Sequence, residues 1–180
     1  MSDPVSLLSM QGICKRFGAV QANNHVDLNL CEGDILGLLG ENGAGKTTLM
    51  NILFGTYQAD EGKIAIKGRQ TTIHSTADAL ELGIGMVHQH FHLVHRHTVL
   101  ENLMVGEPGR MGRLDFSGAR KRLMEIGLQF GLKLDPDARV SELTIGEQQR
   151  LEIIKALFRD AKILILDEPT AVLTPKESEG

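Results

Sequence analysis

Continuous apolar runs and amphipathic segments alternate along this chain. Three runs are almost wholly apolar, which predicts strands buried on both faces of a parallel sheet. They are residues 35–39, Ile84–Val87 and Ile163–Leu166. Three further segments are typical of strands: 5–14, 26–30 and 63–67.

Helical spacing of apolar residues dominates elsewhere. A helix is expected at 48–54, and from Phe91 to about Asp160 the pattern is mostly helical. The expected helix caps are Ser75, Thr98 and either Asp115 or Ser117. The third of these helices would place Ala119, Leu123, Ile126 and Phe130 on one face. A last helix would carry Leu151, Ile154 and Leu157 on its apolar stripe.

Together these elements predict an α/β fold with an inserted helical part. Residues 1–90 would form a core of strands and helices, and residues 91–160 a helical subdomain. Residues 161–180 would return to the core.

The segment between the apolar run 35–39 and the following helix carries the strongest chemical signal. It reads Gly-Glu-Asn-Gly-Ala-Gly-Lys-Thr and matches the phosphate-binding pattern G-x-x-x-x-G-K-[ST]. Its glycines allow several backbone N–H groups to face one anion, Lys46 can reach the β- and γ-phosphates, and Thr47 can ligate Mg²⁺. The candidate nucleotide-binding residues here are Gly40, Asn42, Gly43, Ala44, Gly45, Lys46, Thr47 and Thr48.

Carboxylates at the end of the last apolar run complete the chemistry of nucleotide hydrolysis. Asp167 is placed to hold Mg²⁺ directly or through water, and Glu168 is the candidate to orient or deprotonate the attacking water. Gln89 follows another apolar run, and its amide could touch Mg²⁺ or that water. A solvated acidic pair and a surface glutamine are the alternatives.

Residues 143–150 precede the last helix and permit two interpretations. Thr144 and Gly146 could form a second anion site at the helix N-terminus. Alternatively, Thr144 is an ordinary N-cap, and Glu147 completes a capping box. The local sequence favours the cap.

Phe17 could stack on a purine, because it lies upstream of the phosphate-binding segment between Arg16 and Gly18. The alternative is a core aromatic. Cys14 and Cys31 show no metal-ligand spacing and are interpreted as buried free thiols.

Composition and charge restrict the class of protein. Hydrophobic residues make up 42% of the 180 residues, and no apolar run is long enough to span a bilayer. The start of the chain lacks the regions of a signal peptide, so we expect a cytoplasmic location. A net charge of −4 and an aromatic content of 4% argue against nucleic acid as a partner.

Five elements in order resemble the ATP-binding subunit of ABC transporters: Phe17, residues 40–47, Gln89, residues 143–148 and residues 163–168. In that family they correspond to the adenine-stacking loop, Walker A, the Q-loop, the signature and Walker B. The resemblance implies a P-loop NTPase core, with a mixed sheet, flanking helices and N-terminal antiparallel strands, and an inserted helical subdomain. Details such as His88-Gln89-His90 and the sequence Gly146-Glu147-Gln148 are similar to importers of simple sugars or nucleosides.

The resemblance also implies an activity and partners. We expect an ATPase that uses ATP and Mg²⁺ in a head-to-tail dimer with a second cassette, in which Thr144 and Gly146 contact the γ-phosphate bound by the opposite cassette. Membrane permease subunits would hold the protein at the inner face of the membrane, and a solute-binding protein would act indirectly. The alternatives are a non-catalytic ATP-binding module and a soluble ABC ATPase that is not involved in transport.

Departures from the general family pattern sharpen these expectations. The signature reads Leu-Thr-Ile-Gly-Glu, and the D-loop reads Ala-Val-Leu-Thr. Both variants resemble those that sugar and nucleoside importers carry. No switch histidine follows Walker B, so the chain is expected to be the N-terminal part of a first cassette and weak or inactive alone.

Histidines cluster around Gln89, at positions 88, 90, 92, 95 and 97. A metal site is the minor interpretation, because no cysteine or acidic cluster accompanies them. The favoured interpretation is a polar loop in a flexible linker that faces the permease.

Overall fold

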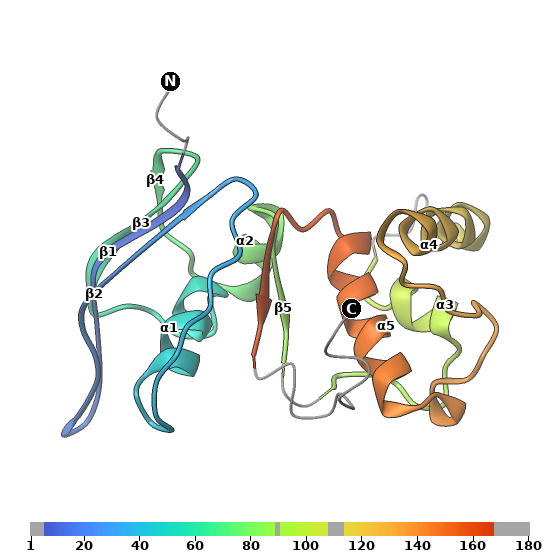
Figure 1. Cartoon of the computed structure of the whole chain (residues 1–180), viewed down its shortest axis with the longest axis horizontal. Helices are drawn as coiled ribbons and strands as arrows, with labels where there is room; N and C mark the ends of the chain where they lie inside the picture. The colour runs from blue at the N-terminus through green and yellow to red at the C-terminus, as the bar shows by residue number, and fades with distance from the viewer. Residues whose placement is uncertain (1–5, 89–90, 108–113, 168–180) are drawn as a thin grey trace. The chain divides into compact units, whose positions relative to one another are not determined.

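The first structural unit contains a four-stranded antiparallel sheet. The computed structural model describes residues 6–88, 91–107 and 114–167, and the chain divides into Met1–Ile84 and Gly85–Gly180. The sheet has the order β2-β1-β3-β4, and each pair of neighbours is antiparallel (Figure 1). Its strands are β1 (Ser6–Phe17), β2 (Val20–Cys31), β3 (Glu61–Ile66) and β4 (Arg69–Thr71). The three strands expected at 5–14, 26–30 and 63–67 are confirmed, and the first two extend into one long hairpin.

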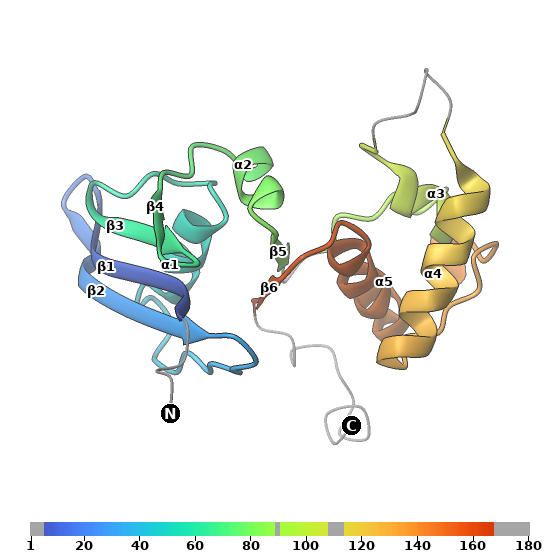
Figure 2. The same ribbon diagram turned by 90° about the horizontal axis from the view of Figure 1, so that it is seen from above.

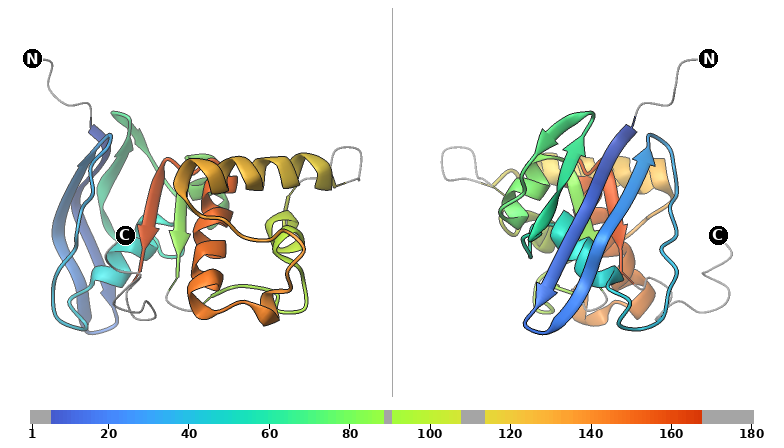
Figure 3. Two further views of the ribbon diagram at one scale, coloured as in Figure 1. Left: turned by 45° about the vertical axis from the view of Figure 1, so that its right-hand side comes forward. Right: turned by 90° about the vertical axis from the view of Figure 1, so that its left-hand side faces the viewer.

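Two helices complete this unit. Helix α1 (Lys46–Leu53) lies against one face of the sheet (Figure 3) and buries Leu49, Ile52 and Leu53. Helix α2 (Thr76–Glu81) begins after Ser75, whose side chain caps the helix as expected. The helix predicted at 48–54 is thereby confirmed, although it starts at Lys46.

The apolar run at 35–39 is not a strand, which corrects the sequence-based expectation. Ile35 and Leu39 are 101% and 97% exposed, and no strand or helix includes these residues. The physical reason is that a strand exists only through hydrogen bonds to a neighbour. The described strands of this unit pair with one another, and none of them pairs with residues 35–39. Apolar composition alone therefore did not decide the conformation.

The second unit combines a short sheet with three helices. Strands β5 (Ile84–Val87) and β6 (Ile163–Leu166) are both present where apolar runs predicted strands, and they pair with each other. β5 is buried throughout as expected, but burial on both faces is wrong for β6, where Leu164 and Leu166 are 36% and 43% exposed. Helices α3 (Val99–Met104), α4 (Phe116–Phe130) and α5 (Ile145–Phe158) lie between them in sequence and pack together (Figure 2). A 3-10 turn, η1 (Val140–Glu142), precedes α5. Among the described residues, no helix is long and apolar enough to cross a membrane.

Helix caps in this unit follow the sequence closely. Thr98 caps α3, Asp115 caps α4, and Thr144 caps α5. Ala119, Leu123 and Ile126 are buried as expected, but Phe130, the last residue of α4, is 50% exposed. The thiol prediction also needs correction, since Cys14 is buried but Cys31 is only half-buried.

Buried polar side chains fasten the histidine-rich segment to the helices of its own unit. The backbone N–H of His92 donates to Glu152 at 2.8 Å, and Lys155 donates to the His92 carbonyl at 3.1 Å. Asn102, only 2% exposed, bonds both the N–H and the carbonyl of Val94. The expectation of a flexible linker therefore does not fit His92 and Val94, whose backbone N–H and carbonyl groups are hydrogen-bonded to side chains of α3 and α5.

Candidate functional site

Glycines shape the loop that precedes α1. Gly43 and Gly45 have φ values of 84° and 86°, a left-handed conformation that residues with side chains adopt at a cost. At Gly45 a Cβ atom would also collide with the carbonyl oxygen of Ala22. The buried Asn23 side chain donates to the Gly45 carbonyl at 3.1 Å and so ties the loop to β2. Only glycine satisfies both the conformation and the space at position 45.

Lys46 is held at the mouth of this loop. Its ammonium donates to the carbonyl oxygens of Gly40 at 2.7 Å and Glu41 at 2.9 Å. These contacts place a positive charge beside the backbone of residues 40–45. An ammonium group has three N–H donors. An anion at the loop can therefore accept the third hydrogen bond from Lys46 or replace one of the two carbonyl acceptors.

The start of α1 differs from the starts of α2, α3 and α5. Its N-cap is Gly45, no side chain caps it, and its first turn carries no acidic residue. The other three helices begin with complete capping boxes. The first N–H groups of a helix lack intrahelical acceptors and attract negative charge. The α1 N-terminus therefore offers its donors and the positive end of its dipole to an anion, next to Lys46.

Phe17 ends β1 and stays accessible. The residue is 43% exposed, and its ring meets the ring of Tyr57 edge-on, with centroids 5.2 Å apart. The Lys15 ammonium lies 5.5 Å from the Phe17 centroid, close enough for a cation–π contact. This exposure argues against the alternative that Phe17 is a core aromatic residue. Tyr57 follows α1, and its N–H donates to the carbonyl of Asn51 in that helix. The structure therefore connects Phe17 with the helix that follows the loop at residues 40–45.

Asp60 fixes the backbone on which Phe17 stands. Its carboxylate accepts from the Lys15 ammonium at 2.8 Å and from the Arg16 N–H at 2.7 Å. The hydrogen bond from Lys15, followed by that from Arg16, lowers the pKa of Asp60. The carboxylate therefore stays ionised and keeps the end of β1 in place.

Asp167 lies where the ends of β5 and β6 meet. Its backbone N–H donates to the carbonyl of Val87 at 3.1 Å, so the residue after β6 adjoins the residue that ends β5. The neighbouring His88 has a lowered pKa, chiefly through burial and then through the charge of His92. Gln89 and Glu168, which continue from these two strand ends, lie outside the described residues.

The signature segment forms the capping box that the local sequence favours. Thr144 donates through its hydroxyl to Glu147 at 2.8 Å and accepts from the Glu147 N–H at 3.3 Å. The backbone and side-chain hydrogen bonds from Thr144 lower the pKa of Glu147, so this carboxylate is ionised at neutral pH. It lies at the helix N-terminus beside Thr144 and Gly146. A phosphate that approaches the same N–H groups would have to displace the Glu147 carboxylate, because two negative charges would otherwise meet there.

Sequence reasoning did not find Asn23 or Tyr57 among the residues that shape the site. A lone asparagine in a strand carries no pattern that predicts its burial or its bond to the loop. Tyr57 is the only tyrosine of the chain, which was a weak signal because one aromatic residue does not identify its neighbour.

We expect that Phe17→Ala weakens binding of ATP and GTP to a similar extent. An aromatic ring stacks on the flat face of a base and does not contact the hydrogen-bonding edge that distinguishes adenine from guanine. Stacking of this kind is worth roughly 1–3 kcal/mol, so affinity should fall at least about fivefold. Inorganic tripolyphosphate should bind as before. Calorimetric titrations of ATP, GTP and tripolyphosphate into the wild-type and Phe17→Ala proteins measure these affinities. Val20→Ala, at the other side of the turn between β1 and β2, is the control. Equal weakening of tripolyphosphate would show that the variant damages the phosphate loop.

The sequence of this chain is similar to those of known proteins. A family model described as ABC transporter matches residues 23–171. The chain is 50% identical over 173 residues to the nucleoside import ATP-binding protein NupA of Lactococcus lactis subsp. cremoris, covering 96% of this chain and 34% of that protein. It is 49% identical to the guanosine import ATP-binding protein NupO of Bacillus subtilis, covering 95% and 34% respectively. The chain thus spans about a third of the length of these curated relatives.

Solved structures of ATP-binding cassettes resemble this chain in fold, at lower sequence identity. The crystal structure of the ADP conformation of MJ1267, an ATP-binding cassette of an ABC transporter, superposes with a TM-score of 0.84 at 28% identity. That match covers 97% of this chain and 73% of MJ1267. A dimeric structure of the cassette MJ0796 bound to ADP and Pi matches with a TM-score of 0.76 at 27% identity, over 96% and 78% of the two chains.

Proposed function

The chain belongs to the ABC transporter family, and we propose that it binds MgATP and takes part in its hydrolysis to drive import of a nucleoside or simple sugar through a membrane permease. The observation that carries this proposal is the loop at residues 40–47. Left-handed glycines, the ammonium of Lys46 and the uncapped start of α1 converge there. This combination suits the phosphates of a nucleotide.

The residues have separate roles in the proposed binding step. The loop amides and Lys46 bind the β- and γ-phosphates, and Phe17 stacks on the adenine beside Tyr57. Thr47, Gln89 and Asp167 offer hydroxyl, amide and carboxylate oxygens, which are the donors Mg²⁺ prefers. The position of Asp167 at the end of β6, beside the end of β5, supports this assignment. At this site Mg²⁺ would neutralise charge on the phosphates.

Hydrolysis requires a base and a second cassette in this proposal. Glu168 accepts a proton from the attacking water as the water oxygen bonds to the γ-phosphorus and ADP leaves. Thr144 and Gly146 contact the γ-phosphate held by the opposite cassette, after Glu147 has turned away from the helix end. Residues 1–90 and 161–180 then supply one half of the composite site. Residues 91–160 supply the surface presented to the opposite half. The dimeric cassette MJ0796 supports such an arrangement by analogy.

The proposed cargo and location follow from the relatives. NupA and NupO are named for import of nucleosides and guanosine, which favours a nucleoside over a simple sugar for the protein that contains this chain. The proposed partners are a permease pair, a second cassette and, indirectly, a solute-binding protein. Attachment to the permease would place the chain on the cytoplasmic face of the membrane.

The experiment that tests this function is transport by the full-length protein reconstituted with its permease in vesicles. ATP supplied on the cassette side should drive accumulation of labelled guanosine, with ribose as the comparison solute, and ADP should support none. The Lys46→Ala variant should abolish accumulation in the same vesicles. ATP hydrolysis that the permease and the solute leave unchanged would contradict the transport role.

A further inference from the structure

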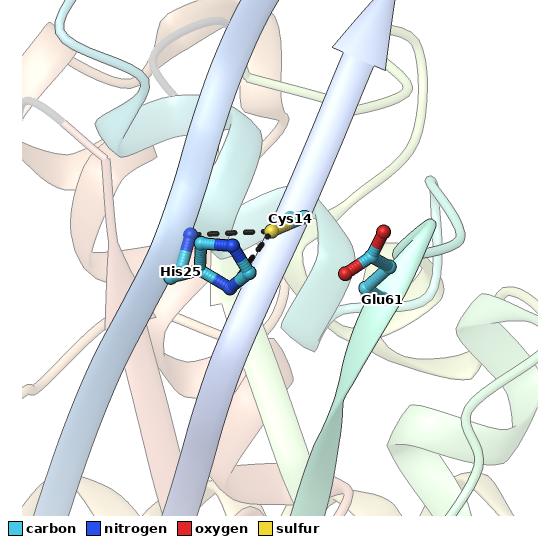
Figure 4. A group of neighbouring side chains, drawn as sticks. All are labelled: Cys14, His25 and Glu61. Carbon is cyan, nitrogen blue, oxygen red and sulfur yellow. Dashed lines mark hydrogen bonds between the residues drawn. The ribbon is translucent and has the colours of Figure 1, made fainter.

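A group of metal-binding side chains lies in the antiparallel sheet of the first unit. Cys14 comes from β1, His25 from β2 and Glu61 from β3, so three adjacent strands each supply one residue (Figure 4). Their potential ligand atoms all lie within 4.8 Å of one another. Figure 4 shows Cys14 between the imidazole and the carboxylate. None of these residues has a role in the nucleotide site, so this cluster is a separate feature.

A β-bulge brings the imidazole to the thiol. On β1, only Cys14 lies between the paired residues Ile13 and Lys15, whereas on β2 two residues lie between their partners Val26 and Asn23. His25 is one of the two, and its φ of 47° is left-handed. Extra residues in a strand re-aim side chains, and bulges recur beside functional sites. Cys14 and Glu61 are direct register partners, so their side chains share one face of the sheet.

The geometry of the thiol and the imidazole fits a tetrahedral zinc ion. The Cys14 Sγ and His25 Nδ1 atoms are 3.5 Å apart. Zn–S and Zn–N bonds of about 2.3 and 2.0 Å at a tetrahedral angle place sulfur and nitrogen about 3.5 Å apart. The His25 backbone N–H also donates to Sγ at 3.2 Å, so a second contact holds the sulfur beside this residue. The pair thus needs little movement to become two ligands of one ion.

The donor set narrows the choice of metal. One sulfur, one nitrogen and one oxygen suit Zn²⁺, whereas Mg²⁺ and Ca²⁺ prefer oxygen ligands throughout. Cys14 is buried, while His25 and Glu61 are exposed, so the outer side of the cluster is open to solvent. Three protein ligands and an open fourth position are typical of zinc sites that keep a bound water.

We propose that Cys14 Sγ, His25 Nδ1 and a carboxylate oxygen of Glu61 bind one Zn²⁺, with water as the fourth ligand. Binding releases the thiol proton of Cys14 to solvent, and the sulfur stays reduced. The ion ties β2, β1 and β3 together. It also adjoins the end of the sheet that carries Phe17, because the Asp60 N–H donates to the Cys14 carbonyl at 2.8 Å. The inference does not depend on nucleotide binding.

Titration of the reduced chain with Co²⁺, a coloured substitute for Zn²⁺, tests this site. We expect one equivalent to give a thiolate-to-cobalt charge-transfer band and the intense visible bands of a tetrahedral site, both abolished by added Zn²⁺. Cys14→Ser should remove the charge-transfer band. His25→Asn and Glu61→Gln should each weaken binding about tenfold or more, because even residues that only support a ligand affect metal affinity by 10–100-fold. Asparagine tolerates the left-handed conformation at position 25.

Matched variants separate this site from adventitious binding. Cys31→Ser, His74→Asn and Glu32→Gln remove the same chemical groups elsewhere in the unit and should leave the spectrum and affinity unchanged. Circular dichroism checks that each variant is folded. If Cys14→Ser does not fold, the test rests on His25→Asn and Glu61→Gln, because these two side chains are exposed. Absence of the charge-transfer band in the wild-type chain would overturn the proposal, as would affinity unaffected by His25→Asn and Glu61→Gln. In that case the Cys14–His25 contact is a hydrogen bond that holds the bulge.

Discussion

Glu168→Gln is expected to stop ATP hydrolysis in the complete cassette pair with its permease, while ATP binding is retained. The amide has the shape of the carboxylate but cannot accept a proton from the attacking water. General-base catalysis contributes roughly 10²–10⁴-fold to such rates, so turnover should fall by at least two orders of magnitude. Phosphate release measures turnover, and equilibrium binding of labelled ATP measures retention.

Controls make this result specific to the base. Glu125→Gln removes an exposed carboxylate from α4 and should leave turnover unchanged. The 180-residue chain alone should bind MgATP but hydrolyse it very slowly, since Thr144 and Gly146 act on the opposite cassette in the proposed dimer. Rapid turnover by the monomeric chain would show that its site is complete without that partner, which contradicts the transporter-motor mechanism.

Lys46→Ala should lower ATP affinity at least tenfold. The substitution removes a charge-assisted contact to the phosphates, and such a contact is worth roughly 1.5–3 kcal/mol. It also removes the bonds to the carbonyls of Gly40 and Glu41, so the loop itself loses a support. Thermal unfolding of the variant therefore accompanies the calorimetric titration. Lys63→Ala, which removes an exposed lysine from β3, is the control and should bind ATP normally.

Local chemistry explains why so much of the fold was predictable. Helix starts depend on one or two side chains within four residues, so Ser75, Thr98 and Thr144 identified three helices from their own neighbourhoods. The phosphate-binding loop is equally local, because glycines and a lysine at fixed spacing shape it. The likeness to a known family then extended these local signals to an order of motifs along the whole chain.

Features that depend on distant partners were not predictable. Residues 35–39 have the composition of a buried strand, yet no described strand pairs with them, and they are exposed. Asn23 reaches Gly45 only because β2 passes the loop. Cys14, His25 and Glu61 are scattered in sequence and meet only through strand register and a bulge, so spacing rules for metal ligands missed them. Pairing geometry, which a single sequence does not display, decides all three cases.

Binding of the ATP phosphates by residues 40–47 can be measured by calorimetric titration of the wild-type chain with MgATP, tripolyphosphate and adenosine. We expect saturable one-to-one binding of MgATP, competition by tripolyphosphate, and much weaker binding of adenosine, because the phosphates provide most of the contacts. Adenosine that binds as tightly as MgATP, or tripolyphosphate that does not compete, would contradict it.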